Sequence, residues 1–160
     1  MASELFVEKS VDINLPKQEV YDFLKYCKNQ DHFSVWNRTD PAKKTSYQGT
    51  DGTVGFIYSW ESNVKNVGAG SQEISKLVAG ESIGFALRFE KPMKNTGKST
   101  FILAEINPSL TRVTWNFSGP TKFPMSLLKG MFQKMLGKDL AQSLSNLKEL
   151  LEKKSPLLNP

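Results

Sequence analysis

The spacing of apolar residues changes near residue 124 of this chain, and that change restricts the folds open to it. Before this point, short apolar segments alternate with polar residues at a period of two, which is typical of strands. Over residues 124–153 apolar residues recur every three or four positions, which predicts one amphipathic helix of about eight turns. Those residues are Leu128, Met131, Phe132, Met135, Leu136, Leu140, Leu144, Leu147 and Leu151.

Seven segments before this helix have the composition of strands. The first has Val7, Val11 and Ile13 on one parity, although Lys9 interrupts the alternation. Short turns rich in Gly, Asn, Asp and Pro separate the others, so we expect hairpins and an antiparallel sheet. The predicted strands are residues 6–13, 44–48, 53–61, 70–78, 82–90, 100–106 and 111–118, and the predicted turns are residues 49–52, 63–68, 79–81, 94–97 and 107–109.

A short helical region follows the first strand. Pro16 suits a first helical turn, and Val20, Phe23, Leu24 and Cys27 fall on one face. We expect a second helical turn before Trp36 and a loop over residues 37–44.

The order of elements predicts the α+β class. A seven-stranded antiparallel sheet with one apolar face must cover that face, and the C-terminal helix is the long element available for it. We therefore expect the sheet to curl round this helix. Residues 1–154 are predicted to form a single domain, and residues 155–160 a frayed tail. Within the helix, Gly130 and Gly137 suggest a bend or a close approach.

Composition limits the classes of partner. The net charge is +5, but the lysines are scattered and no nucleic-acid-binding motif accompanies them, so no nucleic acid is expected as a partner. Cys27 is the single cysteine, which excludes an internal disulfide and favours a cytoplasmic location. No apolar run approaches the ~20 residues of a membrane-spanning helix, so no membrane insertion is expected.

Short motifs from about Glu4 to Glu152 are familiar in combination. They include Phe33-Ser34-Val35-Trp36, Asp40-Pro41, Gly52-Thr53-Val54-Gly55, Val67-Gly68-Ala69-Gly70-Ser71-Gln72-Glu73-Ile74, Leu87-Arg88-Phe89-Glu90-Lys91-Pro92, Thr111-Arg112-Val113-Thr114-Trp115 and Gly137-Lys138-Asp139-Leu140. In these motifs the chain resembles the polyketide cyclase/dehydrase-like branch of the SRPBCC superfamily. The resemblance implies a helix-grip, START-like fold, with two short helices after the first strand and a cavity for an apolar ligand between sheet and long helix. No position matches a cyclase catalytic motif or a Rieske iron–sulfur motif, so the resemblance implies no catalytic residue.

Strand parity supplies candidate residues for such a cavity. Bulky residues occupy the odd positions of residues 83–89 and of residues 113–117, and the even positions of residues 54–60, including Val54 and Phe56. An apolar lining suits a ligand pocket, whereas the alternative is a filled core. The indoles and phenol of Trp36, Tyr58, Trp60 and Trp115 are the expected polar groups. The predicted ligand-binding residues are Trp36, Tyr58, Trp60, Phe85, Leu87, Phe89, Trp115, Phe117, Met131, Phe132 and Met135.

Ionisable residues give weaker signals. His32 is the single histidine, so neither a metal site nor a metal cofactor is expected. Cys27 is interpreted as a small buried residue rather than a nucleophile. Among the acidic residues, Glu61 and Glu73 are the two to inspect as catalytic acids. Gly68 and Gly70 are interpreted as a turn or bulge, not as a dinucleotide site.

These observations favour a non-enzymatic protein that binds a hydrophobic small molecule. One alternative is a cyclase/dehydrase-like enzyme that needs neither metal nor nucleotide cofactor. A second alternative is a module that binds a protein partner through an exposed apolar patch. Exposed sheet edges are also compatible with a homodimer.

Overall fold

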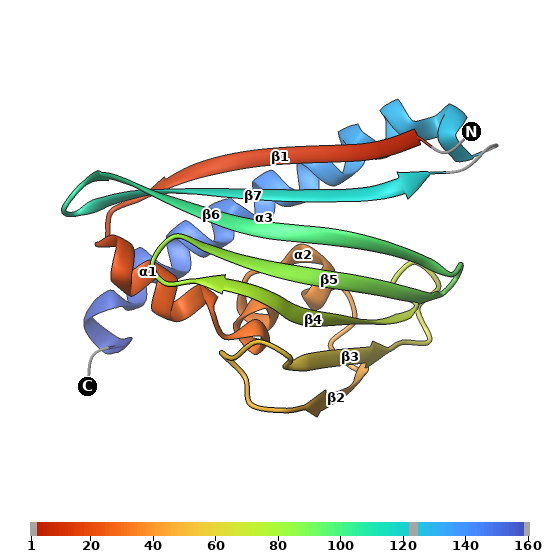
Figure 1. The fold of residues 1–160 in the computed structure, drawn as a ribbon, viewed down its shortest axis with the longest axis horizontal. Coiled ribbons are helices and arrows are strands. Elements are labelled where there is room, and N and C mark those ends of the chain that lie inside the picture. The colour runs from red at the N-terminus through yellow and green to blue at the C-terminus, as the bar shows by residue number, and fades with distance from the viewer. Residues whose placement is uncertain (1–2, 122–124, 159–160) are drawn as a thin grey trace.

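The computed structural model describes residues 3–121 and 125–158. Within these residues the chain forms one seven-stranded antiparallel sheet in the order β1-β7-β6-β5-β4-β3-β2 (Figure 1). The strands are β1 (Ser3–Ile13), β2 (Lys44–Gln48), β3 (Ile57–Glu61), β4 (Ala69–Val78), β5 (Ser82–Lys91), β6 (Asn95–Asn107) and β7 (Leu110–Thr121). The predicted seven-stranded antiparallel sheet is therefore confirmed.

Helices cover one face of this sheet. The short helices α1 (Lys17–Leu24), η1 (Cys27–His32) and α2 (Val35–Arg38) follow β1, and η2 (Met125–Leu128) leads into the long helix α3 (Lys129–Leu158). In Figure 1 α3 passes behind the sheet, from the end of β1 that holds the N-terminus towards α1. This is the helix-grip arrangement that the sequence predicted.

The long helix extends further than predicted. Its predicted start at Pro124 lies outside the described residues, and it continues to Leu158, past the predicted end at Lys153. The prediction that the tail leaves the helix is therefore wrong up to Leu158. α3 includes Pro156, although a proline inside a helix removes one backbone hydrogen bond and is unfavourable there.

The core lies between the sheet and the C-terminal half of α3. Leu140, Leu144, Leu147 and Leu151 are all buried, at the spacing that the sequence predicted. They meet Ile13, Val113 and Leu103 from the strands, and Val20 and Leu24 from α1, in one cluster. At roughly 2 kcal/mol for each fully buried leucine, this helix face contributes much of the free energy of folding.

Two predicted strand starts, those of β3 and β6, differ most from the structure. The predicted turn at residues 94–97 is wrong, because β6 begins at Asn95 and includes Gly97. A Cβ on Gly97 would lie 3.2 Å from the Phe117 ring, so this glycine makes room for a side chain of the neighbouring strand. The prediction that Val54 faces inward is also wrong, because β3 begins at Ile57 and leaves Val54 60% exposed. The adjacent Gly55 has a φ of +98°, which suits a turn rather than a strand.

Of the two helix glycines, Gly137 makes the predicted close approach. A Cβ there would lie 3.2 Å from Lys9 Cε and 3.4 Å from Val7 Cγ1, so β1 crosses the helix at this point. Gly130 has open space around it. The approach at Gly137 explains why Lys9 interrupts the apolar alternation of β1, because its stem lies over the glycine and its amino group reaches solvent.

Candidate functional site

Three half-buried aromatic rings form a row across one end of the sheet. Trp60 of β3 meets Phe89 of β5 edge-on with ring centroids 6.2 Å apart. Phe89 in turn meets Phe117 of β7 at 6.4 Å. We call Trp60, Phe89 and Phe117 the aromatic row. All three belong to the predicted ligand-binding set, and the pairing of the strands brings them together.

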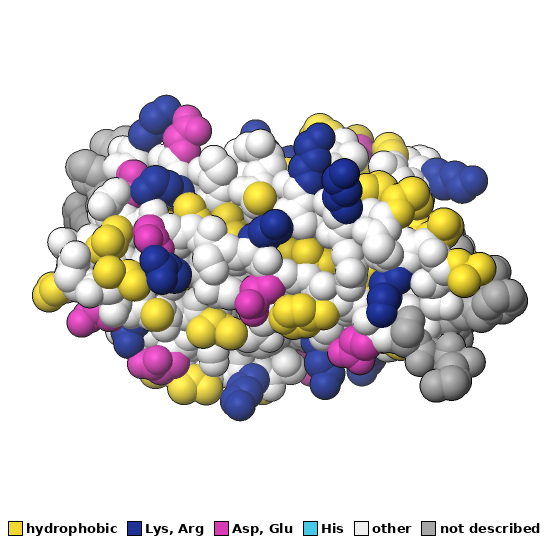
Figure 2. Space-filling model, turned by 90° about the horizontal axis from the view of Figure 1, so that it is seen from above, with side chains coloured by type: hydrophobic (Ala, Val, Ile, Leu, Met, Phe, Trp, Pro, Cys, Tyr) yellow, Lys and Arg dark blue, Asp and Glu magenta, His cyan; other side chains and the backbone are white. Residues whose placement is uncertain are grey.

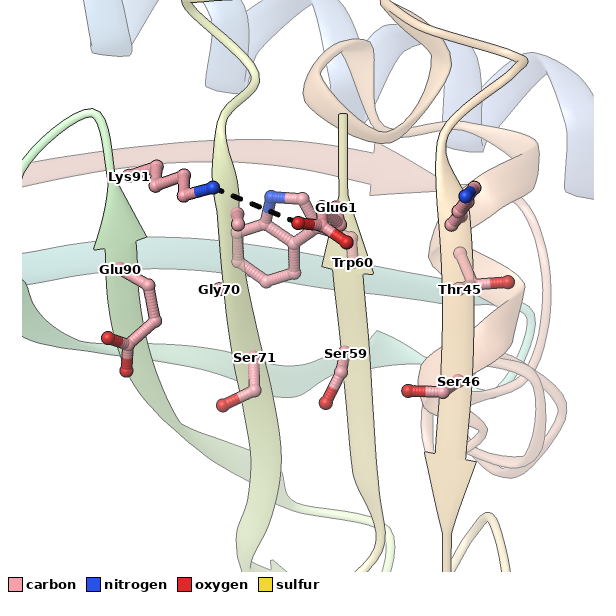
Figure 3. A pocket seen from close by; sticks show the side chains of 11 residues that line it. Thr45, Ser46, Ser59, Trp60, Glu61, Gly70, Ser71, Glu90 and Lys91 are labelled. Carbon is pink, nitrogen blue, oxygen red and sulfur yellow. Dashed lines mark ion pairs between the residues drawn. The ribbon is translucent and has the colours of Figure 1, made fainter. Parts of the chain in front are cut away.

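A glycine makes room for the ring at one end of this row. Gly70 of β4 pairs with Trp60 on one side and with Phe89 on the other. A Cβ on Gly70 would lie 2.8 Å from Cζ2 of Trp60, which is closer than real Cβ atoms come. Figure 3 shows the indole extending from β3 towards β4 near Gly70. The sequence predicted a turn or bulge here, and the register shift between Ala69 and Gly70 confirms the bulge.

Further half-buried residues of the predicted set pack against the core. The Trp36 ring of α2 meets the Trp115 ring edge-on at 5.9 Å. Leu87 lies two residues from Phe89 on the same face of β5, and Phe132 comes from α3. The half-buried members of the predicted set are Trp36, Trp60, Leu87, Phe89, Phe117 and Phe132.

Three other predicted residues lie deep in the core. Tyr58, Phe85 and Trp115 are 1%, 1% and 3% exposed. Phe101 stacks on Trp115 with centroids 4.5 Å apart and meets Phe85 edge-on at 6.0 Å. Around Phe85 and Phe101 the interior is filled by aromatic packing, as in the alternative interpretation of the sequence.

Met131 and Met135 are not at this site in the structure. They are 52% and 54% exposed and lie on the side of α3 opposite Leu140 and Leu144. In the N-terminal half of α3 apolar residues extend round more of the helix than one interface can cover. Sequence spacing alone does not show which side of such a helix meets the sheet.

The indole of Trp115 has an unused hydrogen-bond donor. Its Nε1 is buried and has no partner among the described residues. The Nε1 of Trp60, by contrast, donates to the backbone oxygen of Val67 at 3.1 Å. A buried N–H without a partner costs about 1–3 kcal/mol, so a group that accepts this bond would relieve that cost.

A buried amide pair was not predicted from the sequence. Gln72 of β4 donates through Nε2 to Oε1 of Gln30 at 3.3 Å, and both side chains are buried. Nε2 of Gln30 has no partner among the described residues. The parity of β4, which puts Gln72 on the side of Ile74, could have indicated this inward polar residue.

Tyr58 belongs to a second polar cluster. Its hydroxyl donates to Oδ1 of Asp31 at 2.6 Å, and Nδ2 of Asn37 donates to the same oxygen at 3.0 Å. Nζ of Lys43 lies 3.5 Å from this oxygen. Burial, followed by the hydrogen bond to Asp31, raises the pKa of the Tyr58 phenol well above its ordinary value. The phenol therefore acts as a donor near neutral pH and not as a proton acceptor.

The other ionisable residues singled out in the sequence are exposed, half-buried or buried in a way that lowers their reactivity. His32 and Glu61 are exposed, and Glu61 lies 3.8 Å from Nζ of Lys91 (Figure 3). Glu73 is half-buried. Cys27 is fully buried as predicted, and burial, together with the charges of Asp51 and Asp31, raises the pKa of its thiol. Across residues 3–121 and 125–158, no three His, Cys, Asp or Glu side chains gather as a metal site.

A polar groove of about 500 Å³ lies across β2 to β5. Ser46, Ser59 and Ser71 align across three strands there, on the parity opposite to buried Tyr58 (Figure 3). This groove is therefore on the outer face of the sheet. Its serines, lysines and glutamates differ from the apolar lining that the sequence predicted for a ligand site.

The sequence profile of the family described as polyketide cyclase / dehydrase and lipid transport matches residues 5–152. The chain belongs to this family. No curated protein sequence matches the chain significantly. Among the described residues, no helix has the length and apolar character needed to cross a membrane.

Solved structures share the fold of this family member at low sequence identity. The Zhui aromatase/cyclase from Streptomyces sp. R1128 superposes with a TM-score of 0.69 at 9% identity, over 96% of each chain. A START superfamily protein from Mycobacterium smegmatis has a TM-score of 0.61 at 13% identity, over 93% of this chain and 98% of its own. The Aha1 dimer from Colwellia psychrerythraea has a TM-score of 0.63 at 16% identity, over 92% and 96%.

Proposed function

We propose that this family member binds an apolar small molecule between the sheet and α3, against the aromatic row. The observation that carries the proposal is the buried Nε1 of Trp115, which has no partner among the described residues. Trp115 and Phe117 are two residues apart on the same face of β7, so this donor lies close to the row. A ligand with one acceptor oxygen would satisfy the donor while its apolar body covers the rings.

The arrangement of the aromatic row supports this proposal. The rings of Trp60 and Phe117 pack against glycines, whose lack of side chains leaves more space between the sheet and α3 at this end. Trp36, Leu87 and Phe132 are half-buried around it. Burial of about 100 Å² of apolar ligand surface supplies about 2.5 kcal/mol, so a medium-sized apolar molecule can bind without a charged contact.

The protonated, hydrogen-bonded phenol of Tyr58 favours ligand binding over the enzymatic alternative. A cyclase/dehydrase-like mechanism needs an ionisable group that exchanges a proton near neutral pH. The raised pKa of Tyr58 and its bond to Asp31 work against that role. The family description joins cyclases, dehydrases and lipid transport, and each of these functions acts on molecules with a large apolar part.

Titration with two apolar fluorescent probes tests the proposal. Nile red carries a carbonyl acceptor, whereas N-phenyl-1-naphthylamine does not. Phe89→Ala should lower the affinity of the protein for both probes. Trp115→Phe keeps an aromatic ring but removes the N–H. It should lower the affinity for Nile red by about three- to tenfold and leave the affinity for N-phenyl-1-naphthylamine unchanged.

The control is Ile102→Ala, which changes a residue that is 42% exposed. Chemical denaturation of each variant separates loss of binding from loss of folding. Native mass spectrometry of protein purified from its own cells adds an independent measurement, because a reproducible extra mass would identify the ligand class. If the wild type binds neither probe and carries no extra mass, the interior is a filled core and the proposal fails.

A further inference from the structure

Apolar and basic side chains share the exposed side of α3 near its N-terminal end. Leu127 of η2, which leads into α3, is 73% exposed, and Met131 and Met135 of α3 are about half exposed. Lys134 and Lys138 lie beside the two methionines on the helix surface. Figure 2 shows lysines and apolar side chains intermixed over this end of the molecule. We call Lys9, Leu127, Met131, Lys134, Met135 and Lys138 the basic-apolar patch.

The patch includes a groove between α3 and β1. This groove has a volume of about 480 Å³ and is lined by Lys9, Met131, Lys134, Met135, Gly137, Lys138 and Ala141. Its lining therefore holds three lysines and no carboxylate. The strand reaches the groove because Gly137 lets the Lys9 stem approach, with Cε 3.2 Å from where a glycine Cβ would stand.

The three lysines are available to bind an anion. Among the described residues, none of Lys9, Lys134 and Lys138 forms an ion pair with a carboxylate. Of the nearby acidic residues, Asp139 follows Lys138 in α3 and is half-buried, and Glu8 accepts a bond from Asn116 of β7. The cations thus remain unneutralised beside exposed methionines.

We propose that the basic-apolar patch docks the protein on a lipid surface that contains anionic phospholipids. The charges are complementary, because the three lysines can bind the phosphates of the headgroups. No carboxylate of the groove competes with those phosphates for the lysines. Methionine and leucine side chains enter the interface between headgroups and acyl chains, while lysine stems extend along it. This docking is peripheral, and it involves residues other than the aromatic row.

Vesicle sedimentation of the whole chain, without added ligand, tests the proposal. The protein should bind vesicles of phosphatidylcholine with 30% phosphatidylglycerol, and raised salt should weaken this binding. Pure phosphatidylcholine vesicles should bind little. The double variant Lys134→Glu with Lys138→Glu should lower the apparent affinity about tenfold or more.

A matched control makes the same change of charge elsewhere. Lys65 and Lys76 are also exposed, in the loop before β4 and in β4 itself. Lys65→Glu with Lys76→Glu should leave vesicle binding within about twofold, because these residues are not in the patch. Phe89→Ala should leave vesicle binding unchanged as well, because Phe89 is not in the patch. Vesicle binding and probe binding therefore test the two proposals separately.

Three results would overturn the proposal. The first is no binding to either type of vesicle, and the second is equal affinity of the wild type and the patch variant. The third is a dimer in sedimentation velocity that Met131→Ser with Met135→Ser converts to a monomer. That result would assign the patch to contact between two copies of the chain.

Discussion

Glu152 near the end of α3 accepts two hydrogen bonds from Asn14, which follows β1. The backbone N and the Nδ2 of Asn14 lie 2.8 Å and 2.9 Å from Oε2 of Glu152. Nζ of Lys148 donates to the same oxygen at 2.7 Å. These bonds join the last turns of the long helix to the turn between β1 and α1.

This junction predicts a pH-dependent loss of stability in Glu152→Gln. Partial burial raises the pKa of Glu152, but the bonds from Lys148 and Asn14 outweigh it, so the net pKa is lowered. A lowered folded-state pKa stabilises the fold above the unfolded value of about 4.3, and that contribution is lost as pH falls through the folded value. The variant should lose roughly 1 kcal/mol at pH 7, measured by urea denaturation, and the difference should shrink below about pH 4.

The control for that experiment is Glu149→Gln, which breaks an exposed pair with Lys153 in the same helix. This exposed pair should contribute little to the free energy of unfolding, so the variant should be about as stable as the wild type. A Glu152→Gln variant whose deficit stayed constant from pH 7 to pH 3 would show that the carboxylate charge has no part in the junction.

Gly70→Ala should destabilise the protein by about 1–3 kcal/mol, because the new Cβ would collide with the Trp60 indole and with the backbone of Arg88. Tryptophan fluorescence during denaturation measures both the stability and the environment of the ring. The control is Gly84→Ala in β5, where the nearest atom would lie 3.5 Å from the new Cβ. Equal stabilities of the two variants would refute the close packing of Trp60 on Gly70.

Tyr58→Phe should cost about 1–3 kcal/mol, because Asp31 loses a short hydrogen bond from the phenol. Since the phenol pKa is raised, this contribution persists up to about pH 10 and declines as pH rises further. Tyr47→Phe is the control, because Tyr47 pairs with Tyr58 across β2 and β3 but is 44% exposed. Thermal denaturation at pH 7 and pH 11 measures both effects, and an unchanged Tyr58→Phe midpoint at pH 7 would contradict them.

The Cys27 thiol should resist labelling in the folded protein. Burial withholds the side chain from reagents and raises its pKa, so little thiolate forms. A disulfide reagent at pH 8 should label the native protein at least about a hundredfold more slowly than the denatured protein. Ser75→Cys, at an exposed position of β4, supplies a reactive thiol for comparison. Labelling of Cys27 at the rate of that thiol would show that α1 and η1 open readily.

The periodicity of the sequence determined the fold class and most of the core. Alternation with period two identified the inward residues of β5 and β7, such as Phe85 and Trp115, because successive strand residues face opposite sides. Spacing of three and four identified Leu140 to Leu151 as the buried side of α3. Both patterns are local, so they can be read without knowing which elements become neighbours.

The candidate site depended on contacts between distant segments, which only the tertiary structure decided. Gly70 lies under the Trp60 ring because β3 and β4 pair in one register, and Gln72 meets Gln30 because η1 folds under the sheet. Met131 and Met135 continue the spacing of three and four residues along the sequence, but they lie on the side of α3 opposite Leu140 and face solvent. Apolar residues occupy more than one side of the N-terminal half of α3, and the approach of β1 at Gly137 decides which side the sheet covers.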